Sequence, residues 1–189
     1  IIEPGKKLGN WIEEGSHVEA IYNSWREDIP EDVKNHILHG RAYLKQKKYE
    51  AVFFDVDETL KIMPDFFVAY NLRGDAYFRM GKKERAIEAL EKSLELKADN
   101  LEALTGLGYM YVDKSDYKKA ITYYERAVAA HPDTVIAHYN LGQTYLINGD
   151  SAKAVAEFQW MLDDDPASTE AKHLLEMSQK YLEKQGGKK

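Results

Sequence analysis

The sequence predicts an all-α protein: an α-solenoid of antiparallel helix pairs that ends in a C-terminal capping helix. Three observations predict this class. Residue columns recur every 34 positions, each period holds two apolar stripes of helical spacing, and glycines and prolines stand at the ends of those stripes. Such a period is typical of stacked helix pairs, because one pair cannot bury its apolar face without neighbours.

Four residue columns keep the 34-residue step. One holds glycine, one tyrosine, one small aliphatic residues and one proline, with a single alanine in the proline column. The members are Gly40, Gly74, Gly108 and Gly142; Tyr43, Tyr77, Tyr111 and Tyr145; Val52, Ala86, Ala120 and Ala154; and Pro64, Ala98, Pro132 and Pro166. Agreement between independent columns sets one register over residues 33–168.

The third period shows how one unit is expected to fold. Its two apolar stripes are Leu104, Leu107, Gly108 and Tyr111, and then Tyr117, Ala120, Ile121, Tyr124, Ala127 and Val128. Both have helical spacing, and a short polar turn separates them. We expect Gly108 and Ala120 to let two backbones approach closely, while Tyr111 and Tyr124 fill wider gaps.

Glycine and proline set the helix ends. Pro132 follows the second stripe and stops that helix, because proline lacks an amide donor and clashes with the preceding turn. Gly81 and Gly149 stand where the first helices of their units end, a common place for glycine.

These columns resemble the tetratricopeptide repeat, whose Leu-Gly-x-x-Tyr, Ala, Phe/Tyr, Ala and Pro positions they match. The resemblance implies a right-handed superhelix of four units, at 33–66, 67–100, 101–134 and 135–168. The first unit is divergent, since Val52, Val56 and Thr59 replace the usual Ala, Phe and Ala.

The two ends of the array are expected to differ. Residues 169–189 predict a capping helix and tail, with an apolar side of Ala171, Leu174, Leu175, Met177, Tyr181 and Leu182. A polar outer face on such a helix keeps the end of the stack soluble. Residues 1–32 predict a degenerate helix pair, either in the register of Val18, Tyr22, Trp25 and Pro30 or in one shifted by two residues. The chain begins at Ile1 without methionine, as expected of a fragment or a processed chain.

Composition excludes several function classes. The net charge is -6, which argues against a nucleic-acid binder, because such proteins present a basic face. The absence of cysteine excludes disulfides and thiolate chemistry. No apolar run is long enough to span a bilayer. We expect no cofactor, and a cytoplasmic rather than a periplasmic protein, with peripheral membrane attachment through a partner left open.

One stretch resembles a catalytic motif. Residues 52–60 are similar to the first motif of haloacid-dehalogenase phosphatases, in which Asp55 would be the nucleophile and Asp57 the acid/base. The 34-residue register instead places both on the second helix of the first unit, roughly 200° apart around its axis, so that they cannot converge on one metal. We therefore predict no catalytic residue and keep a phosphatase as a remote alternative.

Other candidates for chemistry are interpreted as structural. His36 and His138 share a repeat column with Tyr70 and Leu104, which favours packing over metal binding. No further ligands stand near His36 and His39, and no metal site is predicted. The acidic run 163–165 is interpreted as a solvated helix end.

The resemblance implies a concave groove lined by the first helices, where a peptide or protein segment would bind. Carrying those positions onto this sequence gives Ile37, Arg41, Leu44, Lys45, Asn71, Asp75, Phe78, Arg79, Thr105, Tyr109, Val112, Ile136, Tyr139, Gln143, Leu146, Ile147 and Tyr181. Some members grip chaperone tails with a clamp of lysines, asparagines and an arginine. The clamp positions here hold Ile37, Arg41, Leu72, Glu102 and Gly106, so we expect no such clamp.

The predicted function is a non-catalytic protein–protein interaction scaffold. Its partner would be a protein or peptide segment, with no nucleic acid and no direct membrane span. The alternative is a self-assembling homo-oligomeric coat, because arrays of similar length include a magnetosome-associated scaffold with a degenerate N-terminal unit.

Overall fold

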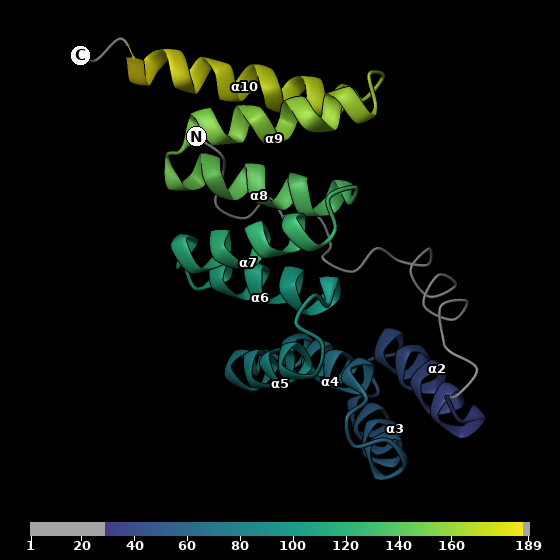
Figure 1. Cartoon of the computed structure of the whole chain (residues 1–189). Helices are drawn as coiled ribbons and strands as arrows, with labels where there is room; N and C mark the ends of the chain where they lie inside the picture. Colours follow the sequence, from purple (N-terminus) through teal and green to yellow (C-terminus); the bar gives the residue numbers. More distant parts are fainter. Residues whose placement is uncertain (1–28, 187–189) are drawn as a thin grey trace. The chain divides into compact units, whose positions relative to one another are not determined.

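The computed structural model describes residues 29–186, which form nine α-helices and no strand (Figure 1). The helices are α2 (Glu31–Lys45), α3 (Tyr49–Ile62), α4 (Phe67–Arg79), α5 (Lys83–Leu96), α6 (Leu101–Asp113), α7 (Tyr117–Ala130), α8 (Val135–Asn148), α9 (Ser151–Asp164) and α10 (Thr169–Gly186). The all-α prediction is confirmed. Most of the helix pair predicted at 1–32 lies outside the described residues.

The described residues fall into two compact parts, which we call the N-terminal part (29–103) and the C-terminal part (104–186). In the N-terminal part, α2 packs against α3 and α4 packs against α5. In the C-terminal part, α8 packs against α7 and α9, and α10 packs against α9 (Figure 1). Each part has its own core of buried apolar side chains.

The divergent first unit forms both of its helices. Its unusual residues Val52, Val56 and Thr59 are each 0% exposed. They therefore occupy interior positions of α3, as the smaller or aromatic residues of the other units do. The divergent first unit still folds, because a protein core tolerates substitutions that keep the apolar pattern and the total side-chain volume.

The helix ends follow the predicted punctuation. Gly149 is the C-cap of α8 with φ of 91°, and Gly81 has φ of 76° just after α4. Both angles lie in the left-handed region that glycine enters without a Cβ clash. Pro132 lies two residues beyond the last residue of α7, so the predicted stop is confirmed.

In the third and fourth units, the column glycine makes room for an aromatic side chain sixteen residues later. A Cβ placed on Gly108 would lie 2.6 Å from Tyr124 Cε1, and one on Gly142 would lie 2.7 Å from Phe158 Cε1. The Tyr124 side chain is 0% exposed. The buried Tyr124 ring therefore fills the space left by the absent Cβ of Gly108.

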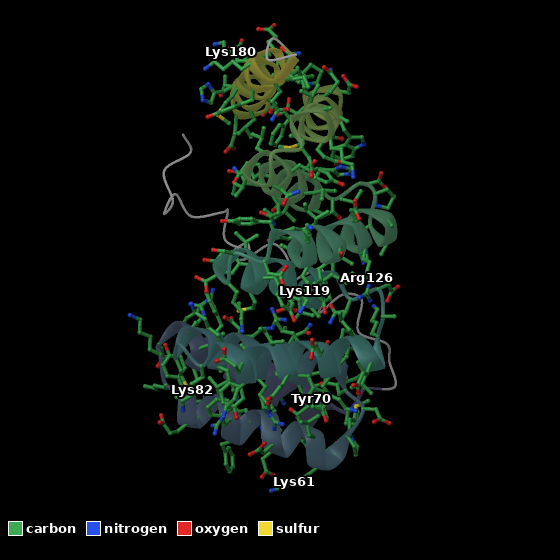
Figure 2. All side chains as sticks on the ribbon, turned by 90° about the vertical axis from the view of Figure 1, so that its left-hand side faces the viewer. Lys61, Tyr70, Lys82, Lys119, Arg126 and Lys180 are labelled. Carbon is green, nitrogen blue, oxygen red and sulfur yellow. The ribbon has the colours of Figure 1, made fainter. Side chains whose placement is uncertain are left out.

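The tyrosine column carries a cation in every unit. The ring centroids of Tyr43, Tyr77, Tyr111 and Tyr145 lie 5.8, 5.7, 5.0 and 5.0 Å from Lys48, Arg85, Lys119 and Lys153, respectively. Figure 2 labels Lys119 and also Arg126, which lies over Tyr123. These distances fall within the range of cation–π attraction.

Candidate functional site

The two aspartates of the phosphatase-like stretch have separate structural partners. Asp55 is buried on α3, and its Oδ1 lies 2.8 Å from His36 Nδ1. Asp57 is exposed and forms an ion pair with Arg73 on α4. Both carboxylates therefore lie on helix α3, and each contacts a different side chain. The strand that would deliver them to one metal is absent from residues 29–186.

His138 confirms the packing interpretation of its column. Its Nδ1 lies 2.7 Å from a Glu157 carboxylate oxygen, its Nε2 lies 2.8 Å from the Pro132 carbonyl oxygen, and its ring stacks on Trp160. His36 and Asp55 repeat this contact at the equivalent positions of the first unit. Across the described helices, no group of three or more acidic or histidine side chains is placed to hold a metal ion.

Four predicted groove residues of the N-terminal part are buried instead, namely Ile37, Leu44, Asn71 and Asp75. Ile37 is 0% exposed and Leu44 is 5% exposed. These apolar side chains fill the interface between the helices of the first unit. They are not available to a ligand, which corrects the positions carried over from the family.

The polar groove residues of the N-terminal part form one connected network. Arg41 Nη2 lies 3.5 Å from Glu102 Oε2, and Asn71 Nδ2 donates to the same oxygen at 3.0 Å. Asn100 donates to Asn71 Oδ1 at 2.9 Å and to Ser93 Oγ at 2.7 Å. The network satisfies buried polar atoms that would otherwise cost stability.

Asp75 is the most perturbed acid of this network. Its side chain is 5% exposed, and Arg79 Nε donates to its Oδ1 at 2.9 Å. Burial raises the pKa of Asp75 to about 6, although the nearby Arg79 charge acts in the opposite direction. Desolvation therefore outweighs the ion pair, because Arg79 itself reaches solvent.

The accessible predicted groove residues of the N-terminal part are mainly basic. Lys45 and Arg79 are exposed, while Phe78 is partly buried. Arg41 is mostly buried by comparison, with 16% of its side chain exposed.

In the C-terminal part, we call the accessible predicted groove residues together the C-terminal face. Its members are Tyr109, Val112, Ile136, Tyr139, Gln143, Leu146, Ile147 and Tyr181, all of them partly or fully exposed. Thr105 was predicted with them but is only 2% exposed, so it does not belong to the accessible surface.

Tyr139 is partly buried on α8. Burial, followed by the negative charge of Glu170, raises the pKa of Tyr139. The hydroxyl therefore stays protonated at neutral pH.

The positions carried over from the family missed Asn140. The equivalent positions of the other units hold Leu38, Leu72 and Gly106. A polar amide where the other units have apolar or small residues was the sequence feature that sets this position apart. Asn140 is 1% exposed, and neither its Nδ2 nor its Oδ1 has a hydrogen-bond partner. Buried amides are nearly always paired, so this side chain needs an explanation.

The paired helices and the 34-residue register define a helical-repeat protein. The tetratricopeptide repeat family model matches residues 71–126 and 108–169, which together cover more than half of the chain. The chain belongs to the tetratricopeptide repeat family. This fold is a general protein–protein interaction scaffold, so proteins and peptides are the class of partner that it suggests.

Several solved structures share the fold. PilF of Pseudomonas aeruginosa has a TM-score of 0.71 at 20% identity, over 82% of this chain and 70% of that one. YrrB, described as a repeat protein with an unusual peptide-binding site, has a TM-score of 0.66 at 21% identity, over 89% and 84%. MamA from Desulfovibrio magneticus RS-1 has a TM-score of 0.64 at 21% identity, over 82% and 93%.

No curated protein matches the sequence. At these identities the solved structures show a common fold alone. None of the helices between residues 29 and 186 combines the length and apolar character needed to cross a bilayer.

Proposed function

We propose that the chain is a non-catalytic scaffold that binds an extended protein segment on its C-terminal face. The observation that carries this proposal is the Asn140 side chain, which is 1% exposed and has no hydrogen-bond partner for either amide atom. Leaving such a group unpaired costs about 1–3 kcal/mol. Because the side chain is buried in the free protein, a ligand reaches the amide only when the side chain turns outward, and pairing there recovers that free energy on binding.

An extended peptide backbone has the complementary chemistry. Each residue of a peptide other than proline offers one N–H donor and one C=O acceptor. The asparagine amide has both an acceptor oxygen and a donor nitrogen, so it can pair with the N–H and the C=O of one residue of an extended chain, which point to the same side. Such pairing holds the main chain and leaves the ligand's side chains to other contacts.

The residues around Asn140 support the same proposal. Partly exposed tyrosine and aliphatic side chains of α6 and α8 provide apolar contact area, namely Tyr109, Val112, Ile136, Tyr139 and Leu146. Tyrosine is enriched among the residues that dominate binding energy at protein interfaces. In the N-terminal part, the accessible predicted residues Arg41, Lys45, Phe78 and Arg79 remain proposed contacts.

Asn140→Leu tests the proposal, because it should preserve or raise stability while it weakens peptide binding. Leucine stands at the equivalent position 72, so we expect the variant to fold with equal or greater resistance to urea. Binding of short linear peptides selected from a phage-displayed random library should weaken about tenfold or more. Asn148→Leu, at the exposed end of the same helix, is the matched control and should bind as the wild type does.

Methylation of the peptide's main chain gives a second test. N-methylation of the one residue whose N–H pairs with Asn140 should reduce wild-type binding and leave Asn140→Leu binding unchanged. Selected peptides that bind the wild type and Asn140→Leu equally would remove Asn140 from the binding site and refute the proposal.

Self-assembly, the alternative raised by the sequence, has less support at the C-terminal end. The outer side of α10 carries exposed polar residues, among them Lys172, Glu176, Gln179, Lys180 and Glu183. A polar outer face opposes further stacking on this helix. We expect size-exclusion chromatography with light scattering to give a monomer mass. A concentration-dependent higher mass would favour the coat alternative.

A further inference from the structure

The N-terminal part gathers positive charge around the turns inside its helix pairs. The segments that span these turns in the first two units, 45–51 and 79–85, contain seven lysine or arginine residues and two acids. The equivalent segments of the third and fourth units, 113–119 and 147–153, contain four cations and three acids. The excess positive charge is therefore concentrated in the first two units of a chain whose net charge is -6.

The two basic segments lie side by side. The ring of Phe53, early in α3, has its centroid 4.8 Å from that of Tyr77, near the end of α4. The start of α3 therefore lies beside the end of α4, and both turns meet at one edge of the N-terminal part, where Figure 2 labels Lys82. We call this surface the basic edge. Its exposed cations are Lys45, Lys47, Lys48, Arg79, Lys82 and Arg85.

Most of these cations have no acidic partner within the part of the chain that the structure describes. Arg79 alone pairs with a carboxylate, that of Asp75. Lys48 lies 5.8 Å from the centroid of the Tyr43 ring, and Arg85 lies 5.7 Å from that of Tyr77. The ammonium groups of the remaining three, Lys45, Lys47 and Lys82, contact no carboxylate. Like charges held together repel one another, so an anion at this edge would relieve an unfavourable arrangement.

Lys47 stands where another residue would be more stable. Its φ is 59°, in the left-handed region, and the equivalent positions of the second and fourth units hold Gly81 and Gly149. A residue with a Cβ costs more than glycine in this conformation. The lysine therefore places a charge at the tip of the turn at the expense of backbone stability.

Two further lysines occupy unfavourable positions at the same edge. Lys48 is the N-cap of α3 and Lys82 is the N-cap of α5, and neither side chain caps its helix. The equivalent N-caps are Asp116, which accepts from the Lys119 N–H, and Asp150. A cation near a helix N-terminus is unfavourable, because the helix dipole is positive there. Departures from local preference are expected where a protein functions, so the charge of this edge calls for a partner.

The chemistry of the edge suits carboxylates on a short segment. Lysine ammonium groups donate up to three hydrogen bonds and accept none, so they pair with anionic oxygens. A nucleic acid or an anionic membrane extends past the edge and would also face the acids of a chain with a net charge of -6. A short protein segment contacts the edge alone, and proteins are the class of partner that the fold suggests.

We propose that the basic edge binds an acidic protein segment, with several aspartate or glutamate residues in succession. This is a second surface, separate from the C-terminal face, and it goes beyond the function proposed above. Packed helices lie about 8–10 Å apart, and each residue of an extended chain spans about 3.3 Å. A run of about four acidic residues therefore reaches from one turn to the other.

The probe is a fluorescein-labelled hexaglutamate peptide, with hexaglutamine as the neutral comparison. Fluorescence anisotropy at low salt should show hexaglutamate binding to the whole chain at least about tenfold more tightly than hexaglutamine. The difference should shrink as added salt screens the exposed charges.

The variant Lys48→Asp/Lys82→Asp gives both lysine N-caps the residue found in the third and fourth units. We expect it to resist urea as well as the wild type or better, because aspartate is a favourable N-cap. Hexaglutamate affinity should nevertheless fall by about tenfold or more. Lys118→Asp/Lys172→Asp, at exposed lysines of the C-terminal part, changes the net charge equally and should bind hexaglutamate as the wild type does.

Lys47→Gly provides a second variant that is expected to fold. It removes one charge and the left-handed lysine together, so it should bind hexaglutamate more weakly while its free energy of unfolding rises. Equal affinity of this variant and of Lys48→Asp/Lys82→Asp for hexaglutamate, compared with the wild type, would overturn the inference. Equal losses in the control variant would do so too, because they would show a general effect of net charge.

Competition decides between an acidic segment and other anions. If vesicles of phosphatidylserine and phosphatidylcholine bind through these lysines and hexaglutamate does not displace them, the edge recognises a membrane surface and the inference is overturned. It is also overturned if light scattering shows an oligomer that Lys48→Asp/Lys82→Asp dissociates, because a second copy then occupies the edge. None of these measurements involves Asn140, so failure here leaves the function proposed for the C-terminal face as it stands.

Discussion

Asp75 should make the stability of the protein depend on pH in a direction opposite to that of most ion-paired acids. Its pKa is raised from 3.8 to about 6, with burial as the main cause. The shift of about two pKa units corresponds to about 3 kcal/mol, because one unit is 1.36 kcal/mol. A folded-state pKa above the unfolded value means that the folded chain binds the proton more tightly.

The sign and the pH window follow from that difference. Below the unfolded pKa of 3.8, Asp75 is protonated in both states and has no cost. Stability then falls as pH rises towards about 6, and the whole cost is present above that value. Roughly 2 of the 3 kcal/mol should be lost between about pH 4.5 and 7.

Asp75→Asn isolates this contribution. Asparagine keeps an acceptor for Arg79 Nε but cannot ionise. Urea unfolding of both proteins should show the variant gaining about 2 kcal/mol on the wild type between about pH 4.5 and 7. Asp57→Asn, at an exposed acid, is the control and should follow the wild type closely. Parallel curves for wild type and Asp75→Asn would refute the claim that burial dominates at this carboxyl.

Two further predictions concern the repeat columns, and both are measured by urea unfolding. Gly108→Ala should lower the free energy of unfolding by about 1–3 kcal/mol, because its Cβ would lie 2.6 Å from the rigid Tyr124 ring; an unchanged value would show that the ring can move aside at little cost. Lys47→Gly should raise the free energy of unfolding by about 1 kcal/mol, because Lys47 has φ of 59° where the next unit has Gly81. A loss of stability at position 47 would instead show that the lysine side chain makes a contact worth more than the backbone strain.

The repeat register determined the fold before any coordinates were known. The four glycines stand 34 residues apart, and a Cβ on Gly74, Gly108 or Gly142 would meet the second helix of the same unit, so the column recurs where the helices of a pair approach closely. The same register correctly placed Asp55 and Asp57 on a helix and removed the phosphatase interpretation. Local chemistry also fixed the helix ends, since Gly149 enters the left-handed region at the end of α8.

The binding residues were less predictable, because position in the repeat does not report burial. Ile37 and Leu44 occupy groove columns of the family but are core residues here, since their apolar side chains fill the interior of the first unit. Thr105 is buried as well. Whether a side chain at such a column reaches solvent depends on the sizes of its neighbours on other helices.

The sequence by itself determined the fold class, the period of the array and the helix ends, because these depend on apolar spacing and on the backbone preferences of glycine and proline. Only the tertiary structure decided the pairing of polar groups. It joined Arg41, Asn71 and Glu102 in one network and left the Asn140 amide without a partner. These contacts link residues on different helices, and their distances and burial follow from packing that no single stretch of sequence contains.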